Sequence, residues 1–101
     1  MSLTRQRLID GETTGSSGRM RLNTFARSNN SKVAVSVRGL DDATVQLYAG
    51  DEDDADAMVP MRDGLFESDE VALVDLPLGG WVEARIVGTS STDVYVTVFG
   101  D

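Results

Sequence analysis

The densest group of side chains that could do chemistry is the acidic run Gly50–Asp56, which holds five carboxylates in seven residues. Carboxylate oxygens on a flexible loop are ligands that calcium prefers in proteins. The ligand order of an EF-hand loop, however, requires an acid or amide where Ala55 stands and a glycine where Asp56 stands. The run therefore favours a solvated loop between strands, whose like charges keep a sheet edge from aggregating, over a calcium site.

Catalytic chemistry has few candidate groups, because the sequence contains no histidine and no cysteine. The chain thus lacks an imidazole general base, a thiol nucleophile and the usual ligands of a zinc site. Pairs of carboxylates could serve a glycosidase, but nearly all the acids fall in predicted loops or on predicted solvent faces. We expect a protein without enzymatic activity and without a cofactor or bound metal.

The charges are unevenly distributed along the chain, whose net charge is −8. Residues 1–38 carry seven basic and two acidic side chains (net +5), whereas residues 39–101 carry two basic and fifteen acidic ones (net −13). The acidic total argues against nucleic-acid binding through the whole surface. The asymmetry suits head-to-tail packing of identical copies, or docking of the basic part on an acidic partner. An accidental skew of a solubilising surface is the alternative.

Two groups of residues are the candidates for protein contact: four N-terminal arginines, and two aromatic residues on the outer face of the last predicted strand. They are Arg5, Arg7, Arg19, Arg21, Tyr95 and Phe99. An exposed stripe containing aromatic side chains is typical of a contact surface. Trp81 could stack on sugars together with Tyr48 or Tyr95, but a lone tryptophan in a small β domain more often closes the core or anchors an interface.

The elements that must position these residues are β-strands. Alternation with period two, rich in valine, threonine and aromatic residues, predicts strands. The predicted strands are Leu3–Asp10, Arg19–Phe25, Lys32–Arg38, Thr44–Ala49, Met58–Met61, Leu65–Glu67, Val71–Leu76, Trp81–Val87 and Asp93–Phe99. We expect an all-β fold: an antiparallel β-sandwich, jelly-roll or Ig-like, of about seven to nine short strands.

Glycine-containing pairs mark the predicted turns: Asp10-Gly11, Asp63-Gly64 and Gly79-Gly80. The segment 88–92 separates the last two strands, which we expect to form a hairpin. Residues 1–101 make one domain, in which residues 1–18 are either an N-terminal arm held by a neighbouring chain or an edge strand of the same domain. No apolar run reaches the length of a membrane span or a signal-peptide core.

The order of these segments resembles small virion structural proteins of tailed bacteriophages. The resemblance rests on Leu8-Ile9-Asp10-Gly11 followed by the segment 13–18, on the strand 43–48, and on the closing segments 76–86 and 94–98. It covers nearly the whole chain, through motifs of low specificity. The departures, such as Asp41-Asp42 in place of a glycine-rich turn, lie in loops.

The resemblance implies a structural role, and the family has no catalytic residues whose roles could be assigned to positions in this sequence. The expected function is a capsid decoration or cement protein that binds the major capsid protein or other virion proteins on the capsid surface, after assembly in the host cytoplasm. A homo-oligomer, most simply a trimer, is expected, with no nucleic-acid or membrane partner. A neck or tail component is the alternative within this class, and a carbohydrate-binding or adhesion module is the alternative from another class.

Overall fold

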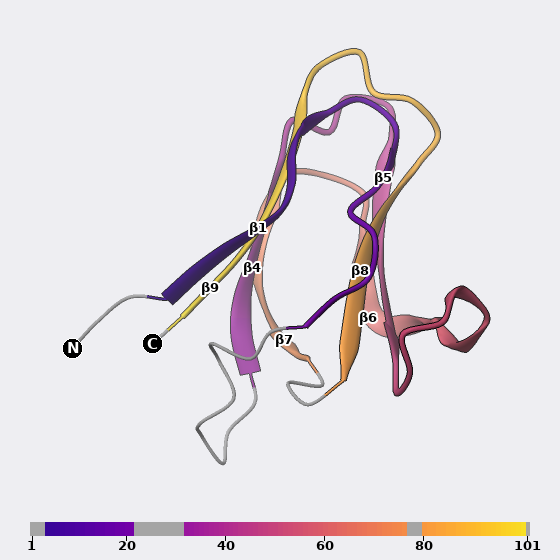
Figure 1. Ribbon diagram of the computed structural model, residues 1–101. Helices are drawn as coiled ribbons and strands as arrows, with labels where there is room; N and C mark the ends of the chain where they lie inside the picture. The colour runs from indigo at the N-terminus through magenta and orange to yellow at the C-terminus, as the bar shows by residue number, and fades with distance from the viewer. Residues whose placement is uncertain (1–3, 22–31, 77–79, 101) are drawn as a thin grey trace.

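The protein is described by a computed structural model in residues 4–21, 32–76 and 80–100. These residues form two antiparallel sheets packed face to face (Figure 1), which confirms the predicted β-sandwich. The elements are β1 (Thr4–Glu12), β2 (Gly15–Ser16), β3 (Met20–Arg21), β4 (Lys32–Arg38), β5 (Thr44–Gly50), the 3-10 helix η2 (Ala55–Ala57), β6 (Val59–Phe66), β7 (Glu70–Asp75), β8 (Trp81–Val87) and β9 (Val94–Gly100). Of the predicted strand 19–25, residues 22–25 lie outside the described residues.

The first sheet has the strand order β1-β9-β4-β7. β1 pairs with β9 from Thr4 opposite Gly100 to Glu12 opposite Val94. Residues 4–12 therefore form an edge strand of the same domain, which was one of the two alternatives for the N-terminal segment. The second sheet has the order β2-β8-β5-β6, with β3 also paired to β8.

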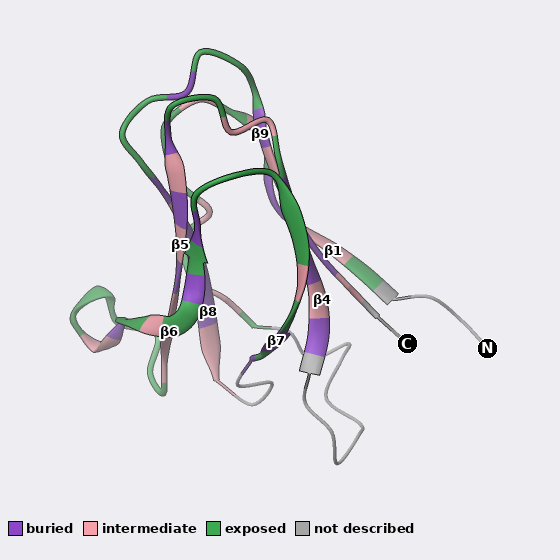
Figure 2. Ribbon diagram, turned by 180° about the vertical axis from the view of Figure 1, so that it is seen from behind, coloured by how far each residue is buried: buried purple, intermediate pink, exposed green. Residues whose placement is uncertain are grey.

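The core lies between the two sheets and is made by the valine-rich face of each strand. Its fully buried large side chains are Ile9, Val35, Val37, Val45, Leu47, Phe66, Leu76, Val82, Val94, Val96 and Val98. Each such side chain contributes about 1.5–3 kcal/mol when it leaves water. Buried residues alternate with intermediate ones along the first part of β5 (Figure 2) and with exposed ones at the end of β6, as the period-two pattern predicts.

A β-bulge in β1 sets the direction of its side chains. The register with β9 shifts between Arg7 and Ile9, so that the consecutive residues Leu8 and Ile9 are both buried in the core. An extra residue in one strand has this effect, because strict alternation would expose one of two neighbours. Arg7 before the bulge and Asp10 after it consequently stay on the outer side of the sheet, where their side chains meet at 2.9 Å.

The predicted turn at Asp63-Gly64 is wrong, because Gly64 lies inside the continuous strand β6. A Cβ atom at Gly64 would come within 2.8 Å of the Cβ of Leu47. The glycine is thus required for the close approach of β6 to β5, beside a register shift between Gln46 and Tyr48. The predicted turn at Asp10-Gly11 is wrong as well, because Gly11 lies inside β1. The register with β9 shifts there, so Gly11, with a φ of 83°, forms a second β-bulge.

The predicted hairpin between the last two strands is wrong as well. β8 belongs to the second sheet and β9 to the first, so residues 88–93 cross from one sheet to the other. The buried Ser90 fixes this crossing: its N–H donates to the carbonyl of Thr13 at 2.8 Å, and its hydroxyl donates to the carbonyl of Gly39 at 3.0 Å. β8 and β9 each bury one face, so β8 lines the core from the second sheet and β9 lines it from the first.

Candidate docking face

The outer face of the first sheet collects the side chains that β1, β9, β4 and β7 turn away from the core. The strand registers align eight of them in two rows: Arg5, Phe99, Ala34 and Leu73 in one, and Arg7, Thr97, Ser36 and Val71 in the other. Asp10, Tyr95 and Arg38 form a shorter row beside them. We call this surface the docking face. It is basic at Arg5, Arg7 and Arg38, and it is apolar along β7, where Val71 and Leu73 are 62% and 70% exposed.

A shallow hollow of about 350 Å³ lies on the basic half of the docking face, and we call it the arginine pocket. Its lining residues are Arg5, Arg7, Ser36, Arg38, Thr97 and Phe99. The hollow exists because small side chains, Ser36 and Thr97, lie between longer ones on the neighbouring strands. Guanidinium groups and hydroxyls around one hollow are suited to binding carboxylates, because both supply hydrogen-bond donors.

The positive charge of the arginine pocket is only partly balanced within the described residues. Arg7 pairs with Asp10, and the guanidiniums of Arg7 and Arg38 lie 5.2 and 4.2 Å from the centre of the Tyr95 ring. Arg5 and Arg38 form no ion pair there. The Nε of Arg7 is buried and makes no hydrogen bond. The exposed guanidiniums of Arg5 and Arg38 therefore present donors and charge that an anionic partner could satisfy.

Four of the six predicted contact residues come together here. Arg5, Arg7 and Phe99 line the arginine pocket, and Tyr95 lies beneath the guanidiniums of Arg7 and Arg38. Sequence reasoning missed Arg38, although it shares the outer side of β4 with Ala34 and Ser36. The alternation that places Ala34 and Ser36 on one side of the strand 32–38 places Arg38 on the same side, so the sequence could have identified it.

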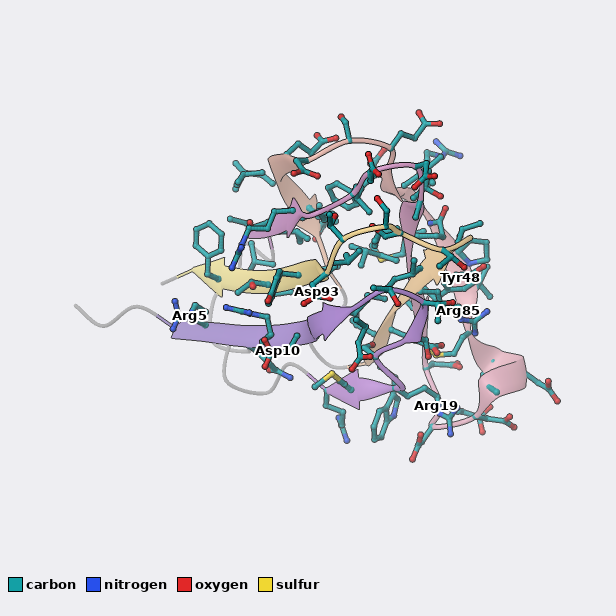
Figure 3. All side chains as sticks on the ribbon, turned by 90° about the horizontal axis from the view of Figure 1, so that it is seen from above. Arg5, Asp10, Arg19, Tyr48, Arg85 and Asp93 are labelled. Carbon is teal, nitrogen blue, oxygen red and sulfur yellow. The ribbon has the colours of Figure 1, made fainter. Side chains whose placement is uncertain are left out.

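Arg19 and Arg21 lie elsewhere, beside the second sheet. Arg19 pairs with Asp53 at 2.6 Å, a hydrogen bond that raises the pKa of the arginine. Arg21 is placed 5.4 Å from the centre of the Trp81 ring. Figure 3 shows Arg5 and Asp10 on the β1 side of the molecule, with Arg19, Tyr48 and Arg85 on the other side. The six residues thus do not form one surface.

The aromatic residues considered for sugar stacking are divided between the sheets. Trp81 and Tyr48 belong to β8 and β5, and Tyr95 to β9. Each ring has a guanidinium against one of its faces: Arg21 on Trp81, Arg85 on Tyr48 at 3.8 Å, and Arg38 on Tyr95. Cation–π contacts of this kind hold the rings in place and cover area that a sugar would stack upon.

The second sheet contains a buried carboxylate, Glu83, whose Oε1 accepts a hydrogen bond from Nη2 of Arg85 at 2.9 Å. Burial alone would raise the pKa of Glu83. Hydrogen bonds from Arg85 and Ser16, together with the charges of Arg85 and Arg19, outweigh burial, so that its pKa falls below the ordinary value of 4.5. Glu83 thus links β8 to the segment that contains β2.

We expect this linkage to make stability depend on pH in the acidic range. A carboxylate whose pKa is lower in the folded state stabilises the fold above its unfolded pKa, and this contribution is lost as the pH falls through the folded pKa. Urea unfolding between pH 7 and pH 3 should show the loss, and Glu83→Gln should reduce it. Glu67→Gln is the control, because Glu67 is exposed. An unchanged pH dependence in Glu83→Gln would contradict this role.

The acidic run 51–56 forms an exposed loop between β5 and β6. Asp54 caps the 3-10 helix η2 by accepting from the N–H of Asp56 at 3.0 Å. Among residues 4–21, 32–76 and 80–100, no three acidic side chains converge in a way that could hold a metal ion. No helix in this part of the chain is long and apolar enough to cross a membrane.

Comparison with known proteins gives no relative: no family model, no curated protein and no solved structure matches the chain.

Proposed function

We propose that this protein is a non-enzymatic structural component of a virion, which decorates the capsid by binding an acidic protein surface through its docking face. The observation that carries the proposal is the arginine pocket, where three guanidiniums, two hydroxyls and the Phe99 ring surround one hollow on an otherwise acidic protein. Arginine and aromatic residues are enriched in protein interfaces, and fixed charges of one sign select a complementary partner.

The other half of the docking face supports the same proposal. Val71 and Leu73 stand exposed on the edge strand β7, directly across β4 from the pocket. A capsid lattice presents the same site many times, so that modest contacts accumulate through multivalency. A neck or tail component would use the same face on a partner present in fewer copies.

Reversal of the pocket charge tests this function. We expect the double variant Arg5→Glu/Arg38→Glu to lose about tenfold or more of its affinity for capsid shells assembled without the protein, because like charges replace complementary ones. Co-sedimentation of the variant with the shells measures the loss. Arg62→Glu is the matched control, since Arg62 is an exposed cation on β6, away from the docking face. Equal binding by the double variant and the control would overturn the proposed docking face.

A further inference from the structure

We infer that the arginine pocket of one copy receives the acidic loop 51–56 of a second copy, in a head-to-tail contact between identical chains. This inference names a second occupant for the pocket, and it rests on one part of the proposed function, namely that the docking face binds acidic surfaces. The pocket holds one occupant at a time, so the loop of a second copy and an acidic shell surface would compete for it.

The pocket supplies one side of the contact. Of its three guanidiniums, only that of Arg7 has a carboxylate within reach in the described part of the chain, namely Asp10. Arg7 and Arg38 lie against the same Tyr95 ring, so a further anion bound beside them would offset the repulsion between their like charges. An arginine can hold a carboxylate through two parallel hydrogen bonds.

The loop supplies the other side. Residues 51–56 are all exposed, and Asp51, Glu52 and Asp56 accept no hydrogen bond and form no ion pair within the described residues through their side chains. Asp53 and Asp54 are already used by Arg19 and by the cap of η2. Two exposed acids outside the loop are already engaged: Asp69 accepts from the N–H groups of Gly39 and Leu40, and Asp41 accepts from the hydroxyl of Ser91.

The positions of the two features require a second chain. Figure 1 shows the loop containing η2 standing out beside β6, on the side of the sandwich opposite to the start of β1. The loop consequently cannot fold into the pocket of its own chain. A contact between two different surfaces of identical copies closes into a ring or extends as a chain.

Complementary charge reversals test the contact. In the first variant the pocket is reversed (Arg5→Glu/Arg38→Glu), and in the second the loop is reversed (Asp51→Lys/Glu52→Lys/Asp56→Lys). Sedimentation equilibrium should show wild-type masses that exceed the 10.9 kDa monomer at low salt. The masses should fall at about 1 M salt, where screening acts beyond about 3 Å. Each variant alone should associate about tenfold or more weakly, and an equimolar mixture should recover association, because each reversed surface then meets its complement.

The matched control reverses three exposed acids outside the loop, in Asp42→Lys/Glu67→Lys/Glu70→Lys, and should associate like the wild type. Circular dichroism confirms that each variant is folded. A wild type that stays monomeric at low salt, or a mixture that fails to recover association, would overturn the contact between copies. Shell binding by the same wild type would still support the proposed function. Conversely, association that persists without shell binding would reject the proposed function alone.

Discussion

Gly39→Ala is expected to lower the free energy of unfolding by about 4 kcal/mol, among the largest effects of any single substitution in this chain. Gly39 has a φ of 88°, a left-handed conformation that costs an alanine about 1–2 kcal/mol. A Cβ atom there would also collide with the backbone carbonyl oxygen of Asp93. The backbone is held on both sides: its N–H donates to Asp69, and its carbonyl accepts from Ser90 and Thr92. The chain therefore cannot move aside without losing these bonds.

Gly88→Ala is the matched control, because Gly88 has nearly the same φ, 87°, but no atom within 4 Å of the position a Cβ would take. It should cost only about 1–2 kcal/mol, the price of the left-handed conformation alone. Urea unfolding of the two variants measures the difference. Equal losses would show that the contact between Gly39 and Asp93 does not constrain the crossing between the sheets.

Phe66→Ala is expected to destabilise the fold by about 3–5 kcal/mol, since it removes one of the largest fully buried side chains and leaves a cavity. Domains of this size are stable by about 5–15 kcal/mol, so the variant should be partly unfolded at modest urea concentrations. The effect depends on β6 being one continuous strand, in which Phe66 pairs with Val45 and faces the core.

Leu65→Ala provides the comparison for Phe66→Ala. Leu65 is the preceding residue, faces the outside and is 50% exposed. Its truncation should therefore cost well under half as much, about 1 kcal/mol. Urea unfolding monitored by circular dichroism measures both variants. A larger loss for Leu65→Ala than for Phe66→Ala would place β6 in the opposite register.

Strand existence could be predicted from the sequence because alternation is a local property. Lys32–Arg38 and Trp81–Val87 have the predicted bounds, since each alternates without interruption. The functions of glycines were predicted less well. Gly64 and Gly11 read as turn residues, yet one allows a close approach of two strands and the other forms a bulge. Whether a glycine turns the chain depends on the neighbouring strand, which the sequence alone does not identify.

The candidate site shows the same limit. Arg5, Arg7 and Phe99 could be selected from charge and alternation, but their meeting around one hollow depends on the pairing of β1 with β9 and β4. That pairing in turn requires β9 to leave β8 and join the first sheet. Arg19 and Arg21 belong to the same basic segment, yet they follow β2 to the second sheet and contact Asp53 and Trp81 there. Charge along the sequence therefore overestimated the extent of the basic surface.

The proposed decoration of a capsid is tested most directly by quantitative mass spectrometry of gradient-purified virus particles from the source system, scaled to the major capsid protein. Decoration predicts a copy number comparable with that of the capsid protein, because the docking face would be used once per lattice site. A few copies per particle would contradict decoration and assign the protein to the neck or tail. Its complete absence from the particles would contradict the virion role.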